Sequence, residues 1–219
     1  MKTIYTVLTI IITYCSYAQN ITNTLGSIGT FTIKDGSANF LTLSQSTGQV
    51  NILNTLRLEN TTSASVGVLY KGANRFLHNY GTNNTFLGVS SGNFIMSGTF
   101  NTALGYTSLL SNSTGHNNTA LGTLALNSNT TGNNNTAVGL SSLLLNISGN
   151  SNTAVGNQSL LNNNTGGANT ALGVLSLYNN TIGSFNTAMG HSSLELNTTG
   201  NNNTALGWLS LYSNTIGYN

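Results

Sequence analysis

The stretch from Asn101 to Asn117 reads NTALGYTSLLSNSTGHN, and the letters NTALG return at once from Asn118. Self-similarity at a fixed period without insertions is typical of a repeat architecture. The consensus is N-T-A-Φ-G-x-x-S-L-x-x-N-x-T-G-x-x, where Φ is apolar and positions are numbered from 1 to 17. The N-T-x-x-G pentad begins at eight places, each 17 residues after the last: Asn84, Asn101, Asn118, Asn135, Asn152, Asn169, Asn186 and Asn203.

Two positions of the repeat are apolar throughout the array. Position 4 is leucine, valine or methionine, and position 9 is leucine except in the first repeat, which has Gly92. Position 8 is small and position 15 is glycine, whereas positions 6, 7, 10 and 11 vary freely. We interpret the fixed positions as the inside and the corners of each repeat, and the variable ones as its outside. The predicted structural ladder is Leu104, Leu109, Leu121, Leu126, Val138, Leu143, Val155, Leu160, Leu172, Leu177, Met189, Leu194, Leu206 and Leu211.

The period predicts an all-β fold, a parallel β-solenoid (β-roll) of 17-residue coils. Paired helices need roughly 33 residues or more per repeat. We expect a short strand at T-A-Φ, a corner at the glycine, a second strand around S-L and a broad turn at N-x-T-G. Stacking coils about 4.8 Å apart brings each position against its counterpart.

The composition agrees with such a stack. Only 4% of the residues are charged and none is proline. Like charges placed directly opposite each other destabilise a sheet, and proline removes a ladder donor. Asparagine and threonine, by contrast, can form hydrogen-bonded ladders from coil to coil.

The chain before the array divides into three predicted segments. Residues 1–18 have a basic start, an apolar run too short to span a membrane, and small residues before Ala18, which together predict a signal peptide cleaved after Ala18 and a secreted or cell-surface protein. Residues 19–66 contain alternating runs at 31–33, 40–43, 50–52 and 56–58 and predict a β-rich fibre or collar segment. Residues 67–83 are interpreted as a connector to the array at 84–219. Asn219 lies one residue short of the next expected pentad, so we expect the chain to be a fragment that stops inside the array.

The pentads NTALG, NTAVG and NTAMG followed by x-x-S-L resemble the head repeats of YadA-like trimeric autotransporter adhesins. They are still more similar to the NTAVG-type arrays of secreted Bacteroidota proteins and of phage or giant-virus tail-fibre-like proteins. The resemblance covers residues 84–219, and the stretch from Ile28 to Leu58 is similar to the fibre shaft segments that precede such arrays. It implies a left-handed parallel β-roll, three chains about one axis, and attachment to a surface.

Side chains that could carry catalysis are scarce. The acids lie in three separate regions, so no carboxylate pair can be placed: Asp35, Glu59 and Glu195. The histidines share no repeat position and show no metal-ligand spacing, and we interpret them as surface residues: His78, His116 and His191. The only cysteine, Cys15, lies in the predicted signal peptide. The sequence therefore predicts a protein that is not an enzyme and has no metal site and no cofactor.

The charge of the chain limits its partners. A net charge of +2 from scattered basic groups gives no electrostatic footprint for nucleic acid. No direct membrane span is predicted either. N-x-S/T sequons such as Asn112-Ser113-Thr114 are numerous, as the asparagine- and threonine-rich composition dictates. In a bacterial product they would mostly stay bare, whereas in a eukaryotic or viral host glycans could coat the rod.

The variable positions hold the candidate ligand-contact residues, which are Tyr106, Tyr178, Trp208 and Tyr212. Aromatic side chains on a polar face suit contact with sugar or protein, and packing between chains is the alternative interpretation. The small alanine at position 3 would let neighbouring chains approach closely, so we expect a homo-oligomer, which the resemblance makes a homotrimer.

The predicted function is a secreted, cell-surface fibre or adhesin-like structural protein. Its expected partners are itself and a glycan, matrix protein or host-surface ligand. The alternative is an ice-binding β-solenoid that uses the threonine row at position 2, although flat ice-binding faces usually carry two outward threonines per coil.

Overall fold

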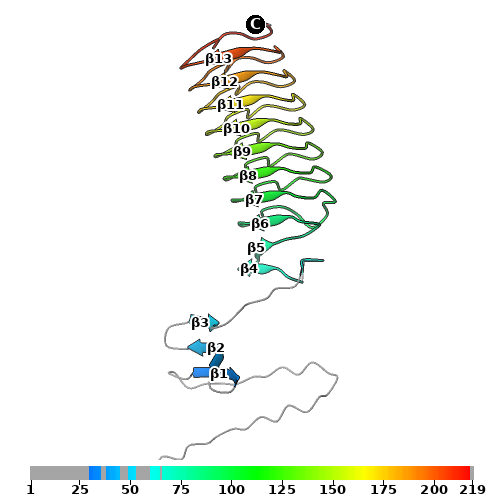
Figure 1. The fold of residues 1–219 in the computed structure, drawn as a ribbon, viewed down its shortest axis with the longest axis vertical. Coiled ribbons are helices and arrows are strands. Elements are labelled where there is room, and N and C mark those ends of the chain that lie inside the picture. Colours follow the sequence, from blue (N-terminus) through cyan, green and yellow to red (C-terminus); the bar gives the residue numbers. More distant parts are fainter. Residues whose placement is uncertain (1–29, 36–37, 45–48, 53–59, 65, 218–219) are drawn as a thin grey trace, which may run out of the picture. The chain divides into compact units, whose positions relative to one another are not determined.

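The computed structural model describes residues 30–35, 38–44, 49–52, 60–64 and 66–217 (Figure 1). All regular structure in these residues is β-strand. The chain divides into two compact units, Met1–Arg57 and Leu58–Asn219, each described by itself. The predicted signal peptide lies outside the described residues. No helix among the residues described is long and apolar enough to cross a bilayer.

The first unit contains a three-stranded antiparallel sheet in the order β1-β2-β3. Its strands are β1 (Thr30–Asp35), β2 (Ala38–Ser44) and β3 (Gln49–Ile52). Phe31 lies opposite Leu43, which in turn lies opposite Val50. Three of the four predicted strand runs are therefore confirmed, and the fourth, at residues 56–58, falls outside the described residues.

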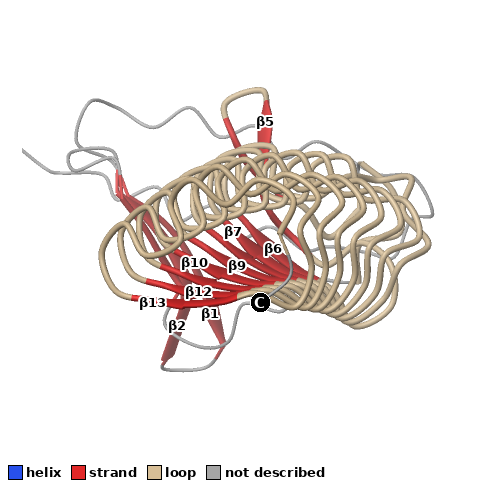
Figure 2. Cartoon of the chain, turned by 90° about the horizontal axis from the view of Figure 1, so that it is seen from above, coloured by secondary structure: helices blue, strands red, loops and turns tan. Residues whose placement is uncertain are grey.

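The second unit is built on one ten-stranded sheet (Figures 1 and 2). It begins with an antiparallel hairpin, and β5 pairs with β6 antiparallel. From β6 onward every pair is parallel and in register at an offset of one repeat, as in Thr136 opposite Thr153. The predicted β-solenoid of 17-residue coils is thus confirmed. The strands are β4 (Leu69–Lys71), β5 (Asn74–His78), β6 (Thr85–Leu87), β7 (Thr102–Leu104), β8 (Thr119–Leu121), β9 (Thr136–Val138), β10 (Thr153–Val155), β11 (Thr170–Leu172), β12 (Thr187–Met189) and β13 (Thr204–Leu206).

Each coil contributes only three residues, T-A-Φ, to the parallel sheet. Side chains alternate across a strand, so positions 2 and 4 share one face and position 3 takes the other. In β9, Ala137 is fully buried while Thr136 and Val138 are partly exposed. Gly139 then ends the strand with a positive φ of 130°. A Cβ at this glycine would overlap the backbone of Gly156 in the next coil, so the stacked corner has no room for a side chain.

The predicted second strand around S-L is wrong. Positions 6 to 11 form turns in every coil from Gly105 onward. Gln158 and Leu160, at positions 7 and 9, both adopt the left-handed region with φ of 56° and 52°. Alternating left-handed residues curl the chain too tightly for a strand, but Leu160 N–H still donates to Ser176 O of the next coil at 2.9 Å. The turns therefore stack by backbone hydrogen bonds without being a sheet.

The apolar interior consists mainly of the alanine at position 3 and the leucine at position 9. The position-9 leucines from Leu109 to Leu194 are fully buried, as predicted. The prediction is wrong for Leu211 in the last coil, which is 37% exposed because no described coil stacks on it. The expectation that position 4 also lies inside is wrong, because its side chains project from the outer face of the sheet: Leu104, Leu121, Val138, Val155, Leu172, Met189 and Leu206. Alanine at position 3 cannot ease the approach of a second chain, because it is enclosed in its own coil.

Two asparagine ladders complete the interior, at positions 1 and 12, and confirm the predicted hydrogen bonding between coils. At position 1, Asn152 donates from its backbone N–H and its Nδ2 to Asn135 Oδ1, at 3.0 and 3.2 Å. At position 12, Asn146 Nδ2 donates to Asn129 Oδ1 at 2.8 Å and to Gly149 O at 3.0 Å. These ladders satisfy polar groups that burial would otherwise leave without partners.

The first coil departs from the others at positions 3, 9 and 12, and Ile95 at position 12 is 86% exposed where the other coils have an asparagine. The changes at positions 3 and 9 concern the apolar interior. Phe86 replaces the alanine of position 3 and Gly92 replaces the leucine of position 9. Phe86 is fully buried, and a Cβ at Gly92 would lie 2.6 Å from its ring carbon Cδ1. The phenylalanine ring fills the room that the leucine occupies elsewhere, so the two departures compensate each other.

Candidate functional site

The four aromatic residues predicted for ligand contact are not brought into one site. Tyr106 and Trp208 lie at position 6 near opposite ends of the array and are strongly exposed, 55% and 74%. Tyr178 and Tyr212 lie at position 10 and are only half-buried rather than fully outside. Side chains at position 10 are therefore not fully exposed, because they pack partly against their own coil.

An apolar stripe runs along the array beside the position-5 glycine corner. It is continuous at position 4, whereas at position 6 it is interrupted by Thr123, Asn157 and His191. Positions 4 and 6 supply it, and their most exposed members leave 38% to 74% of the side chain open. Strand pairing holds the position-4 residues in register from coil to coil, as in Leu172 opposite Met189. The threonines of position 2 flank the stripe on the sheet face. The exposed members of this apolar stripe are Leu104, Tyr106, Leu140, Leu172, Val174, Met189, Leu206 and Trp208.

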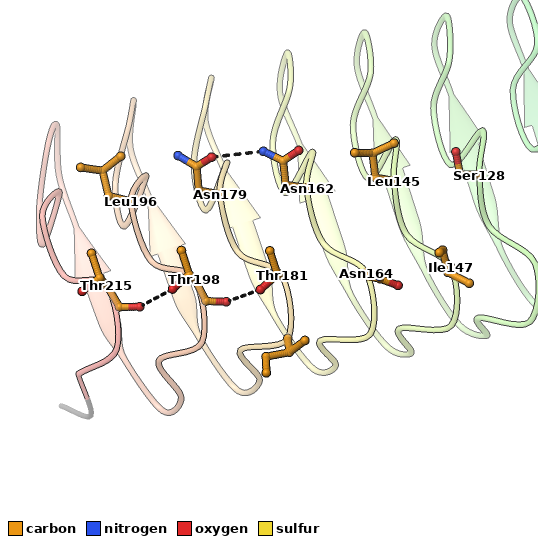
Figure 3. Close-up of a pocket in the computed structure, with 11 residues that line it drawn as sticks. Ser128, Leu145, Ile147, Asn162, Asn164, Asn179, Thr181, Leu196, Thr198 and Thr215 are labelled. Carbon is orange, nitrogen blue, oxygen red and sulfur yellow. Dashed lines mark hydrogen bonds between the residues drawn. The ribbon is translucent and has the colours of Figure 1, made fainter.

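A groove of about 790 Å³ follows the array elsewhere on the coils. Side chains at positions 11 and 13 form its two walls (Figure 3), and Ile182 at position 14 adds to the lining. Positions 11 and 13 flank the asparagine of position 12, which is buried from Asn112 to Asn197. Asn162 Nδ2 donates to Asn179 Oδ1 at 3.2 Å along one wall, and Thr181 Oγ1 donates to Thr198 O at 2.9 Å along the other. Its lining residues are Ser128, Leu145, Ile147, Asn162, Asn164, Asn179, Thr181, Ile182, Leu196, Thr198 and Thr215, and none of them is charged.

Sequence reasoning missed this groove, although a signal for it was present. Position 12 is asparagine in every coil after the first, and an asparagine that points inward there turns its two neighbours outward, so positions 11 and 13 had to form parallel rows. The groove combines aliphatic surface with amide and hydroxyl groups. That lining suits an uncharged ligand, since no lining side chain can pair with a charge.

The N-terminal end of the solenoid is closed by an aromatic cap, formed by Arg75, His78, Tyr80, Phe86 and Phe94. The interpretation of His78 as a surface residue is wrong, because its side chain is only 3% exposed. Its ring lies 4.8 Å, centroid to centroid, from the rings of both Phe86 and Phe94. Burial lowers the pKa of His78 below its ordinary value, and the nearby Arg75 charge lowers it further against the opposing effect of a hydrogen bond to Ser91.

Arg75 binds the turn that follows β6. Its guanidinium donates to the carbonyls of Ser90, Ser91 and Gly92, and its Cζ lies 5.2 Å above the ring of Phe94. Partial burial lowers the pKa of this guanidinium, and Tyr70 opposes the shift. Backbone carbonyls and an aromatic face thus take the place of a carboxylate partner.

The remaining titratable residues lie apart. His116 and His191 are exposed, as predicted, and His116 Nδ1 accepts a hydrogen bond from Thr99 N–H at 3.2 Å. Within the described part of the chain, no group of three or more histidine, cysteine or acidic side chains could hold a metal ion. Glu59 is not among the described residues, so its predicted separation from the other acids stays a prediction.

No protein-family model, no curated protein and no solved structure matches the chain. The resemblance to adhesin head repeats and tail-fibre-like arrays therefore stays a prediction. The function has to be argued from the solenoid itself.

Proposed function

We propose that the chain is a secreted, cell-surface fibre or adhesin-like structural protein that works as a homotrimer. The repeat array forms its rod. Its partners are further copies of itself and a glycan, matrix protein or host-surface ligand that contacts side chains displayed on the rod. Catalysis has no part in the proposal.

The observation that supports this proposal is the exposed apolar stripe. Its position-4 residues follow one another on paired strands, so the apolar surface is continuous along the array. Contiguous exposed apolar surface of this kind is typical of interaction sites. Copies of the same chain meet little electrostatic repulsion along it, because Glu195 is the only acid in the repeats and Arg75 precedes them.

Light scattering on the full chain tests the proposal, with Leu104→Lys and Leu172→Lys combined as the interface variant. Both side chains are more than 40% exposed, so the lysines leave the fold intact while placing charge in the stripe. We expect a three-chain mass for the wild type and a monomer mass for the variant, with unchanged circular dichroism. The matched control is Leu145→Lys, an exposed leucine of the groove, which should stay trimeric. A wild type that is monomeric at every concentration would overturn the proposal.

The ice-binding alternative gains one observation from the fold. Position 3 points inward, so the second outward row beside the threonines is position 4, which is aliphatic. Threonine and aliphatic rows repeat in register on one parallel sheet, as in Thr136 and Val138 opposite Thr153 and Val155. Thermal hysteresis of the wild type, lost when Thr136 and Thr153 are replaced by lysine, would favour this function over the fibre. The two functions compete for the same face.

A further inference from the structure

The geometry of the aromatic cap points to a device that the proposed function does not use. We propose that the β4–β5 hairpin is an acid-sensitive cap, which protonation of His78 detaches from the first coil. The device belongs to the N-terminal end of the solenoid, and it holds whether or not the chain is an adhesin.

The hydrogen bonds of His78 fix its ring in the neutral form. Nε2 lies 2.8 Å from Ser91 O, which can only accept, so Nε2 carries the proton. Nδ1 accepts the backbone N–H of Tyr80 at 3.4 Å. A second proton on Nδ1 would point an N–H at another N–H. Protonation therefore replaces a hydrogen bond with a clash between two donors.

The charges around His78 make its protonated form still less favourable. Arg75 Nε also donates to Ser91 O, at 3.4 Å, so a charged imidazole would place two cations on one carbonyl. The other titratable groups on the packed elements are Tyr70, Lys71 and Tyr80, none of which is an anion at neutral pH. Phe86 and Phe94 enclose the ring and exclude water. The part of the second unit that the structure describes places no carboxylate in the cap.

Besides His78, Arg75 also holds the hairpin to the first coil, because its guanidinium donates to the carbonyls of Ser90, Ser91 and Gly92 and its own carbonyl accepts the N–H of Ser90 at 3.1 Å. The strand pairing itself is short. Only two residue pairs join β5 to β6, Leu77 with Leu87 and His78 with Phe86. Gly88 N–H adds a hydrogen bond to Phe76 O at 2.7 Å. Since His78 is itself one of the paired residues, its protonation directly weakens the pairing of β5 with β6. Detachment would expose the edge of β6, whose unpaired backbone groups are a template for another strand.

The direction of the pH effect follows from linkage. The closed cap holds His78 at a lowered pKa, whereas the open cap restores the ordinary value of about 6.5. The open form therefore binds more protons below that pH, and closure weakens as the pH falls through it. Between pH 7.5 and pH 5.0 the equilibrium constant for closing the cap can fall by at most about thirtyfold through this one group. We expect a fall within this limit.

Hydrogen exchange of the full chain at pH 7.5 and pH 5.0, corrected for intrinsic exchange rates, tests the cap. We expect protection of residues 74–92 to fall in acid by up to about thirtyfold, while residues 152–160 in the middle of the array keep theirs. His78→Gln keeps a neutral donor for Ser91 O and should abolish the pH dependence. His116→Gln, at an exposed histidine, should retain it. Unchanged protection of residues 74–92 in the wild type would overturn the proposal.

A second measurement decides the case in which His78→Gln opens the cap at both pH values. The wild-type ring of His78 is titrated by NMR and compared with the loss of protection. Ring titration below pH 6.5 that coincides with cap opening supports the proposal. A ring that titrates at or above the ordinary value, or opening without ring titration, contradicts it.

Discussion

The exchange of two residues in the first coil offers the sharpest test of how the coils pack. Phe86 and Gly92 stand where the next coil has Ala103 and Leu109. The Gly92 backbone has φ of 58° and that of Leu109 has φ of 52°, so a leucine already fits this conformation. Changing Phe86→Ala and Gly92→Leu together rebuilds the consensus pair. The two single changes each break it.

The expected magnitudes separate the three variants. Phe86→Ala leaves an unfilled space in the interior and should cost about 3–5 kcal/mol of the free energy of unfolding. Gly92→Leu forces a side chain against the Phe86 ring and should cost about 1–3 kcal/mol or more. The double variant should cost only about 1 kcal/mol, mainly the lost ring contact with His78. The coupling free energy is then about −3 kcal/mol or larger, at the strong end for residues in contact.

Urea unfolding followed by circular dichroism measures these differences, with hydrogen exchange to locate them. Repeat arrays need not unfold in one transition, so an effect confined to the first coil can be missed in a global curve. The Gly92 amide, which donates to Ser108 O at 2.9 Å, reports the first coil directly. A double variant destabilised by the sum of the two single changes would refute the idea that Phe86 compensates for the missing leucine at Gly92.

Three further tests of the interior, which use five substitutions, rely on the same unfolding measurement. Gly149→Ala would place a Cβ against Asn146 Oδ1 and the backbone of the next coil, so it should lower the free energy of unfolding by several kcal/mol. The control is Gly72→Ala, whose Cβ meets open space and which should cost about 1 kcal/mol through the positive φ alone. Asn146→Ala removes one rung of a buried ladder and should cost about 3–5 kcal/mol, because hydrogen-bonding groups in both neighbouring coils lose their partner. Leu160→Ala should cost about 2–5 kcal/mol and Leu172→Ala less than about 1 kcal/mol, since only Leu160 is buried; equal costs would contradict the inward and outward assignment.

The sequence period was enough to predict the solenoid, but it could not tell which repeat positions face the interior and which face outward. Leu104 and Leu109 are equally regular along the chain, yet only Leu109 is buried. The alternation of side chains along a strand could have separated inward from outward positions, because it places Thr102 and Leu104 on one face and Ala103 on the other. The left-handed backbone of Leu109 could not be predicted, because leucine has no intrinsic preference for that region. Position 9 adopts it because the stacked coil turns its side chain inward there.

The groove and the cap escaped prediction for a different reason. The groove depends on which side of the ladder positions 11 and 13 project, and this follows only once position 12 is known to point inward. The cap depends on partners that the repeat does not contain. His78 is buried by Phe86 and Phe94, which lie in the one coil that departs from the consensus. A histidine in an unrepeated segment carries no periodic signal, so its burial could only come from the structure.

The interior of a coil is too small and too polar to be stable alone, so the stability of the array depends on how its two ends are closed. Each of the six coils that begin at Asn101 to Asn186 encloses the leucine of position 9, the alanine of position 3 and two asparagines, and the asparagine hydrogen bonds run to the neighbouring coils. Among the described residues, Asn197 Oδ1 and Asn214 Nδ2 are the buried side-chain atoms without a hydrogen-bond partner, so the position-12 ladder stops at its last described rung. At the other end the first coil replaces its leucine with an aromatic ring and covers that ring with the hairpin. Stability in such a stack resides between coils rather than within them, so a residue that closes the first coil, as His78 does, controls more than its own contacts.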